Sequence, residues 1–176
     1  MPASLSSLQQ TLQSFGDISR FLREGVADED SRQLRDSLGA LSAHIDEATR
    51  LRRSGADASA ITSRVVELAQ CAREHQLFLT GLGSAWHALY EFGAYQRALR
   101  ELRDAVAAWQ QELERHSARE SACFRQFELL AWRTLGEALL LIDMYEQGSR
   151  GEGGAEPLGP PRRRPWWQCA LRWLGR

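Results

Sequence analysis

The feature that most constrains this chain is a long stretch without proline. Residues from Ser4 to Gln147 contain none, while leucine, alanine, arginine and glutamate abound there and β-branched residues are few. Proline breaks helices, whereas these abundant residues favour them. The composition therefore predicts an all-α body over residues 1–147.

Apolar residues in this body recur at intervals of three and four, which places them on one face of a helix. Glycines at positions 25, 55, 81 and 83 interrupt the pattern, and Asp57 or Ser59 can cap the helix that follows Gly55. We therefore expect four to five antiparallel helices in an elongated bundle or a coiled coil. The expected apolar faces are Leu5, Leu8, Leu12, Phe15 and Leu22; Leu34, Leu38, Leu41, Ile45 and Ala48; Ile61, Val65, Leu68, Ala72, His75 and Leu79; and Phe124, Phe127, Ala131, Leu135, Ala138, Ile142 and Tyr145.

The most regular apolar stripe alternates spacings of three and four, as in a heptad repeat. It predicts either the core of a bundle within one chain or the seam of a dimer. Ser117 and Glu120 have the spacing of a capping box and predict a break, whereas the lack of glycine and proline between Leu113 and Phe124 predicts one helix from Ser84 to Gln147. The stripe consists of Phe92, Tyr95, Leu99, Leu102, Val106, Trp109 and Leu113.

Composition changes at Gly148. Residues 148–161 contain five glycines and three prolines and are expected to form a linker, followed by a basic, tryptophan-rich tail over residues 162–176. Residues 151–176 carry five arginines and two glutamates, a net charge of +3, whereas residues 1–150 carry 17 arginines and 21 acidic residues, a net charge of −4. The sequence thus separates an acidic body from a basic tail.

The tail has the pattern of a short amphipathic helix, with Pro165 at its start. Tryptophan and arginine are typical of a membrane surface, so we expect the tail to bind anionic lipid; docking on the body or on a protein partner, and a disordered end, are the alternatives. Cys169 is a candidate for acylation. The residues expected to bind are Arg162, Arg163, Arg164, Trp166, Trp167, Leu171, Arg172, Trp173 and Leu174.

Other features argue against several classes of protein. The net charge of −1 argues against a dedicated nucleic-acid-binding protein, and three widely spaced cysteines predict a reducing compartment without a disulfide framework. We expect no signal peptide and no membrane-spanning segment, hence a cytoplasmic or peripheral membrane protein. No catalytic motif is present, so we expect neither enzyme activity nor a cofactor; Cys71 and His75 resemble half of a metal site but are expected to be structural.

Two segments resemble known families. The stretch Val65-Val66-Glu67-Leu68, Arg73-Glu74-His75 and Phe92-Gly93, followed by Ala98-Leu99-Arg100-Glu101-Leu102 and Phe127-Glu128-Leu129-Leu130, is similar to the first two helices of a sorting-nexin-type BAR domain. The resemblance covers about residues 61–150, lacks the lysine-rich concave face of that family, and implies membrane organisation. Leu8, Leu12, Phe15, Gly16 and Asp17 resemble a BH3 segment, with Ser19 in place of the last apolar anchor.

Together these features predict a non-enzymatic, membrane-associated adaptor or scaffold in trafficking or membrane organisation. Its body would bind partner helices or a second copy of the chain, and its tail would bind lipid. The alternative is a soluble coiled-coil interaction subunit whose tail docks on a protein partner. An apoptosis regulator acting through Leu8 to Asp17 is a third hypothesis.

Overall fold

The computed structural model describes residues 13–24 and 29–151. Within these ranges the chain forms helices and turns and contains no strand. The all-α prediction is therefore confirmed for the described part. The helices are α2 (Phe15–Glu24), α3 (Glu29–Arg53), α4 (Ala58–Thr80), α5 (Ser84–His87), α6 (Tyr90–Glu114) and α7 (Glu120–Gly151).

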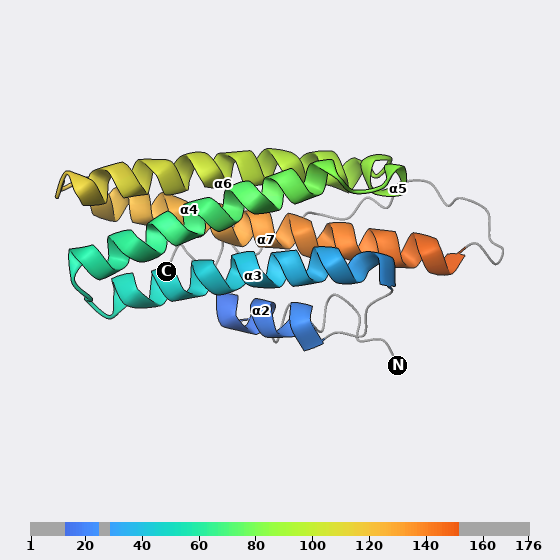
Figure 1. Ribbon diagram of the computed structural model, residues 1–176, viewed down its shortest axis with the longest axis horizontal. Coiled ribbons are helices and arrows are strands. Elements are labelled where there is room, and N and C mark those ends of the chain that lie inside the picture. Colours follow the sequence, from blue (N-terminus) through green and yellow to red (C-terminus); the bar gives the residue numbers. More distant parts are fainter. Residues whose placement is uncertain (1–12, 25–28, 152–176) are drawn as a thin grey trace.

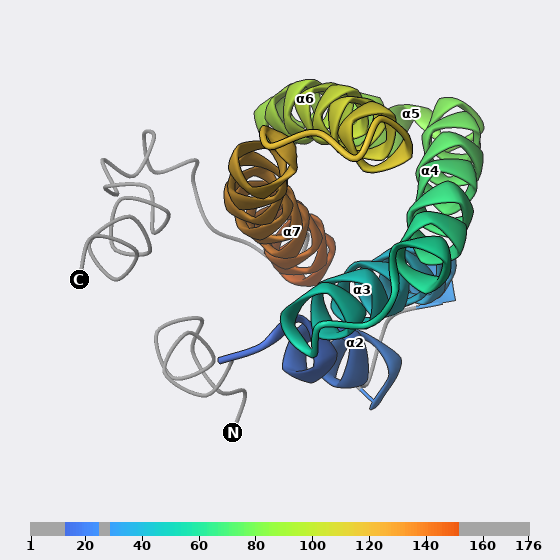
Figure 2. The same cartoon turned by 90° about the vertical axis from the view of Figure 1, so that its left-hand side faces the viewer.

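Four long helices form most of the molecule. Helices α3, α4, α6 and α7 lie along the long axis, and each runs opposite to the one before it (Figure 1). Seen end-on, they form a ring in which α3 contacts α4, α4 contacts α6, α6 contacts α7, and α7 contacts α3 (Figure 2). The short α5 joins α4 to α6, and α2 lies against α3 outside the ring.

The interior of the ring is filled by the apolar faces that the spacing predicts. Each long helix contributes one stripe, because side chains three and four residues apart lie on one face of a helix. Nearly all the predicted stripe residues within the described ranges are buried, and Tyr145 is half-buried. The core of each long helix includes Leu34, Leu38, Leu41 and Ile45 on α3, Val65, Leu68, Ala72 and Leu79 on α4, Tyr95, Leu99, Leu102 and Trp109 on α6, and Phe127, Ala131, Leu135 and Ile142 on α7.

Helix α2 begins with a capping box. The Ser14 hydroxyl accepts a hydrogen bond from the Asp17 backbone N–H at 3.1 Å, and the Asp17 carboxylate accepts one from the Ser14 N–H at 3.0 Å. A Cβ on Gly16 would lie 3.3 Å from an Asp46 carboxylate oxygen, so glycine suits this close approach to α3. The close packing of α2 on α3 therefore accounts for Gly16, and the capping box accounts for Asp17, the Gly-Asp pair of the BH3 resemblance. Leu8 and Leu12 of that resemblance lie outside the described residues.

The apolar face of α2 is packed against other helices. Phe15, Ile18 and Leu22 are at most 3% exposed, and the Phe15 ring stacks on Trp132 of α7 with centroids 4.4 Å apart. Ser19, which stands where a BH3 segment would have its last anchor, is also buried and donates a hydrogen bond to the Gly39 carbonyl at 3.1 Å. This face therefore contributes to the body's own packing.

A break divides the segment that follows α5. Helix α6 ends at Glu114 and α7 begins at Glu120, so the alternative of one continuous helix from Ser84 to Gln147 is wrong. His116 adopts φ = 49°, and the Ser117 N–H donates to the Glu112 carbonyl at 3.1 Å, which together form a Schellman motif with histidine at the position that usually holds glycine. Backbone geometry after α6 therefore ends the helix without glycine or proline.

The capping box predicted at this break does not form. The Ser117 hydroxyl accepts a hydrogen bond from the Arg119 N–H at 3.1 Å, and the Glu120 carboxylate binds Arg52 and Trp109 instead. An ion pair and an indole donor therefore replace the backbone partner that the local pattern predicted for Glu120. At the other end, α7 continues to Gly151, past the expected start of the linker at Gly148.

Candidate functional site

The predicted binding tail lies outside the described residues. Its members, Arg162, Arg163, Arg164, Trp166, Trp167, Leu171, Arg172, Trp173 and Leu174, together with the acylation candidate Cys169, therefore stay predictions. The structure describes the body to which this tail is joined at the end of α7.

The heptad stripe of α6 lies inside a single chain. Its seven residues are at most 6% exposed, and the Trp109 ring packs against both Phe124 and Phe127 with centroid distances of 5.0 and 4.9 Å. Residues at the seam of a dimer would be partly exposed in one isolated chain. The burial of Phe92, Tyr95, Leu99, Leu102, Val106, Trp109 and Leu113 therefore favours the intrachain core.

A chain of polar side chains crosses the interior from α3 through α4 to α6. His75 Nδ1 lies 2.5 Å from the Ser37 hydroxyl, and His75 Nε2 lies 2.5 Å from the Tyr95 hydroxyl. Burial lowers the pKa of His75 to about 4 and raises the pKa of Tyr95 well above its usual value. His75 is therefore neutral at pH 7, and each of its ring nitrogens has a protein partner.

This arrangement resembles a nucleophile and base but lacks access to a substrate. A serine hydroxyl beside an imidazole can be activated for acyl transfer when a substrate reaches it. His75 is 2% exposed and Tyr95 is not exposed at all. The three groups therefore serve as a buried hydrogen-bonded link. His75 also has no ring nitrogen left for a metal beside Cys71, and the described residues contain no group of three or more histidine, cysteine or acidic side chains that could hold one.

The second polar cluster joins the end of α3 to the start of α7. Arg52 donates to both oxygens of Glu120 at 2.7 Å, and the indole N–H of Trp109 donates to the same carboxylate at 2.8 Å. The side-chain hydrogen bond from Arg52 holds the pKa of Glu120 below its usual value, and the bond from Trp109 acts in the same direction. Two-pronged binding of a carboxylate suits arginine and not lysine.

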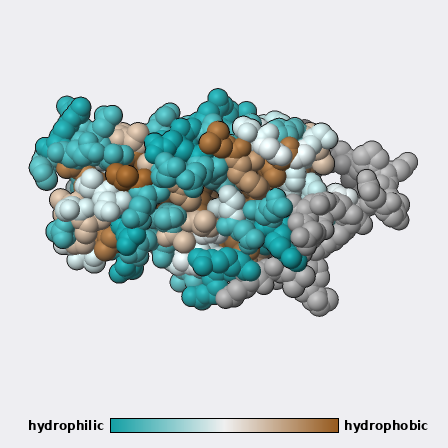
Figure 3. Space-filling view, viewed as in Figure 1, coloured by the Kyte–Doolittle hydropathy of each residue, from teal (hydrophilic) through white to brown (hydrophobic). Residues whose placement is uncertain are grey.

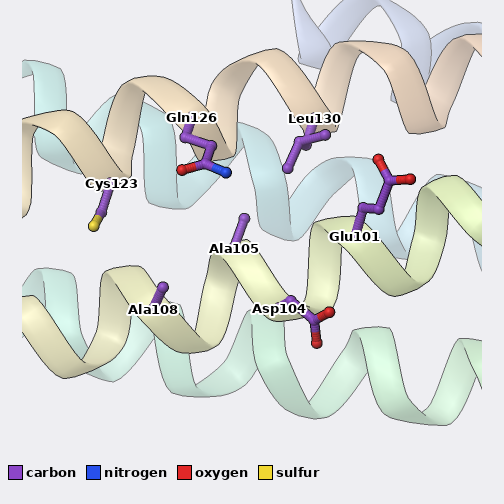
Figure 4. A pocket seen from close by; sticks show the side chains of 7 residues that line it. All are labelled: Glu101, Asp104, Ala105, Ala108, Cys123, Gln126 and Leu130. Carbon is purple, nitrogen blue, oxygen red and sulfur yellow. The ribbon is translucent and has the colours of Figure 1, made fainter.

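A shallow groove runs between α6 and α7 on the outside of the body. Figure 4 shows the α6 side chains and the α7 side chains lining its two sides. Small residues on α6 leave the space, two acidic residues give it negative charge, and Glu101 also pairs with Arg133 of α7. The lining residues are Glu101, Asp104, Ala105 and Ala108 from α6, and Cys123, Gln126 and Leu130 from α7.

Four large apolar side chains are exposed on the described surface. Leu77 and Tyr90 are 70% and 80% exposed, and Val66 and Leu129 are exposed to a lesser degree. Figure 3 shows apolar areas interrupted by hydrophilic surface on one face, including one over the region where α4 and α6 lie in Figure 1. Single exposed apolar residues are common on protein surfaces, so these positions do not by themselves define a site.

The spacing of the sequence predicts the apolar stripes but not the polar clusters. By its spacing His75 is a stripe residue that with Cys71 resembles half of a metal site, and Glu120 is a capping residue. The partners of these residues lie far away in sequence, on other helices. The α6 side of the groove corresponds in sequence to the small residues Ala105 and Ala108 beside the acidic Glu101 and Asp104.

Comparison with known proteins does not identify a family. No protein-family model matches the chain, and no curated protein or solved structure matches it either. The resemblance to a sorting-nexin-type BAR domain therefore stays a prediction. Among the described helices, none has the length and apolar character needed to cross a bilayer.

Proposed function

We propose that this chain is a non-enzymatic, peripheral membrane adaptor or scaffold of the cytoplasm, acting in trafficking or membrane organisation. The observation that carries the proposal is the division of charge and aromatic residues between body and tail. Three of the six tryptophans, Trp166, Trp167 and Trp173, lie with five arginines in residues 151–176, where the net charge is +3. The rest of the chain has a net charge of −4 and is repelled by an anionic surface.

The packing of the body supports different roles for the body and the tail. The apolar faces of α3, α4, α6 and α7 are directed into a common core, so in residues 13–24 and 29–151 the exposed large apolar side chains are limited to Val66, Leu77, Tyr90 and Leu129. The antiparallel ring in Figure 2 favours a bundle within one chain over a BAR-like coiled coil between two chains. Lipid contact would therefore fall to the tail, and the body would present surfaces to a protein partner or a second copy.

The tail combines two attractive forces. Tryptophan rings partition into the interface of a bilayer, and each arginine near an anionic leaflet contributes about 1 kcal/mol. Because a helix of this length is marginal in water, we expect it to form on the membrane. Arg162, Arg163 and Arg164 would supply the electrostatic part, and the tryptophans would supply the apolar part.

Co-sedimentation with vesicles tests this proposal. The full chain should bind vesicles containing phosphatidylserine, and binding should weaken with salt because the Debye length falls from about 10 Å at 0.1 M to about 3 Å at 1 M. Arginine-to-glutamine changes at positions 162–164 should remove the salt dependence and leave weak binding. Trp167→Glu with Leu171→Glu should abolish binding even at low salt, because both charges lie in the apolar face.

A charge-matched variant provides the control. Gln168→Glu with Gly175→Glu adds the same two charges outside the apolar face and should keep much of the binding. Equal binding by the full chain and the Trp167→Glu/Leu171→Glu variant would refute the proposal. A tail without lipid affinity would favour the second candidate, a soluble interaction subunit, for which the exposed Leu77 and Tyr90 side chains are available contacts.

A further inference from the structure

The groove between α6 and α7 has the size, chemistry and position to receive the tail of the same chain. We propose that residues 166–174 dock in this groove as a short helix when no membrane is present. The inference rests on the proposed function, because it assigns a second binding surface to the same apolar face of the tail. Membrane and groove would then compete for Trp166, Trp167 and Leu171.

The shape of the groove suits bulky side chains. Ala105 and Ala108 line it with single methyl groups, whereas Leu130 and Cys123 supply apolar contacts from the opposite side (Figure 4). Leu130 and Cys123 are both half-buried, so they keep part of their apolar surface in water. An occupant that covers this surface with indole rings would gain from the hydrophobic effect.

The charges of groove and tail are complementary. Glu101 and Asp104 are exposed on the α6 side of the groove; Glu101 pairs with Arg133 of α7, so Asp104 is the main negative charge that faces the tail. The tail carries Arg162, Arg163 and Arg164 before its helix and Arg172 within it. Opposite charges at the rim of a groove steer and orient an occupant more than they add to its affinity.

The length of the connecting chain allows the contact within one molecule. Leu130 precedes Gly151, the last residue of α7, by 21 positions, so the two lie about 32 Å apart along the helix. Residues 152–165 supply 14 residues, which span at most about 46–50 Å. The tether therefore reaches the near end of the groove without full extension.

The lengths of groove and tail also agree. Leu130 and Cys123 are about 10 Å apart along α7, and a helix from Trp166 to Leu174 is about 12 Å long. The tail would run back along α7, with Trp166 near Leu130 and Leu174 near Cys123. Docking in this direction would cover the Cys123 thiol.

Cys123 therefore serves as a natural reporter of docking. Cys123 and Cys71 are both free and half-buried, and Cys71 lies on α4, away from the groove lining. The experiment measures the rate at which iodoacetamide alkylates each thiol, by mass spectrometry, in the full chain carrying Cys169→Ser. At an effective concentration of about 1 mM, a docking constant of about 0.1 mM would slow alkylation of Cys123 about tenfold.

Two variants in the same background test the contact from each side. Trp167→Glu with Leu171→Glu should release Cys123 to react about tenfold faster, while the charge-matched Gln168→Glu with Gly175→Glu should keep most of the protection. Asp104→Arg changes the groove and leaves the tail intact, and it should also increase the rate of Cys123 alkylation because it repels the basic tail. Alkylation of Cys71 should be the same in all these chains, which controls for changes in the fold.

The outcomes separate this inference from the proposed function. Equal Cys123 rates in the parent chain and the Trp167→Glu/Leu171→Glu variant overturn groove docking, whether or not the tail binds vesicles. Protection of Cys123 without vesicle binding keeps the inference and refutes the membrane proposal. Protection that is lost on dilution of the protein overturns docking within one molecule and indicates a second copy of the chain as the occupant. If the tail both docks in the groove and binds membranes, phosphatidylserine vesicles should abolish the protection of Cys123 from alkylation.

Discussion

Acid should destabilise this protein through the buried side chain of His75. The imidazole is 2% exposed and is held between the Ser37 and Tyr95 hydroxyls at 2.5 Å on each side. Burial lowers the pKa of His75 from 6.5 to about 4. The unfolded chain, in which this histidine is hydrated, therefore binds a proton more readily than the folded chain does.

The direction and size of the effect follow from this difference. Well above pH 6.5 the histidine is neutral in both states and contributes no pH dependence. Between pH 6.5 and pH 4 the unfolded state takes up the proton first, so the free energy of unfolding falls as the pH falls. Because one pKa unit corresponds to 1.36 kcal/mol, the loss approaches about 3 kcal/mol near pH 4.

Urea unfolding of matched variants isolates this contribution. The free energy of unfolding, followed by tryptophan fluorescence, is compared from pH 7.5 to pH 4 in the parent, in His75→Gln and in His87→Gln, which changes an exposed histidine. Asp17, Glu112 and Glu120 have lowered pKa values and also cost stability in acid, but they are present in all three proteins. His75→Gln should be less stable at pH 7, and the gap should narrow by about 3 kcal/mol by pH 4.

Two results would contradict this reasoning. Parallel stability curves for the parent and His75→Gln from pH 6.5 to pH 4 would show that His75 titrates equally in both states. An NMR titration that places the pKa of His75 near 6.5 in the folded protein would do the same.

Three further substitutions test the packing and the helix ends. Gly55→Ala should lower the free energy of unfolding by about 1 kcal/mol, because Gly55 has φ = 71°, and a normal denaturation midpoint would contradict the described turn. His116→Gly should raise it by about 0.5–1 kcal/mol by relieving φ = 49°; a loss of stability would count against the Schellman motif. Trp109→Ala should cost about 3–5 kcal/mol, and a folded variant that instead loses mass in light scattering would place Trp109 at a dimer seam.

The sequence alone determined the helical content and the buried faces of the helices, but not where every helix ends. Stripes such as Leu34 to Ala48 and Phe92 to Leu113 depend on a period of three to four residues, which is written along the chain and needs no knowledge of distant partners. Asp57 likewise caps α4 through an N–H only three residues away, in Ala60. Where the interaction is local, the pattern predicts the structure.

The tertiary structure alone decided which faces meet and which polar groups pair. Glu120 has a suitable local role as a capping residue, yet it binds Arg52, 68 residues earlier, because α3 and α7 pack side by side. His75 belongs to an apolar stripe by its spacing, but its partners Ser37 and Tyr95 come from two other helices. These pairings depend on the axial register of antiparallel helices, which is set by the packing of the whole core and leaves no repeating signal in any one segment.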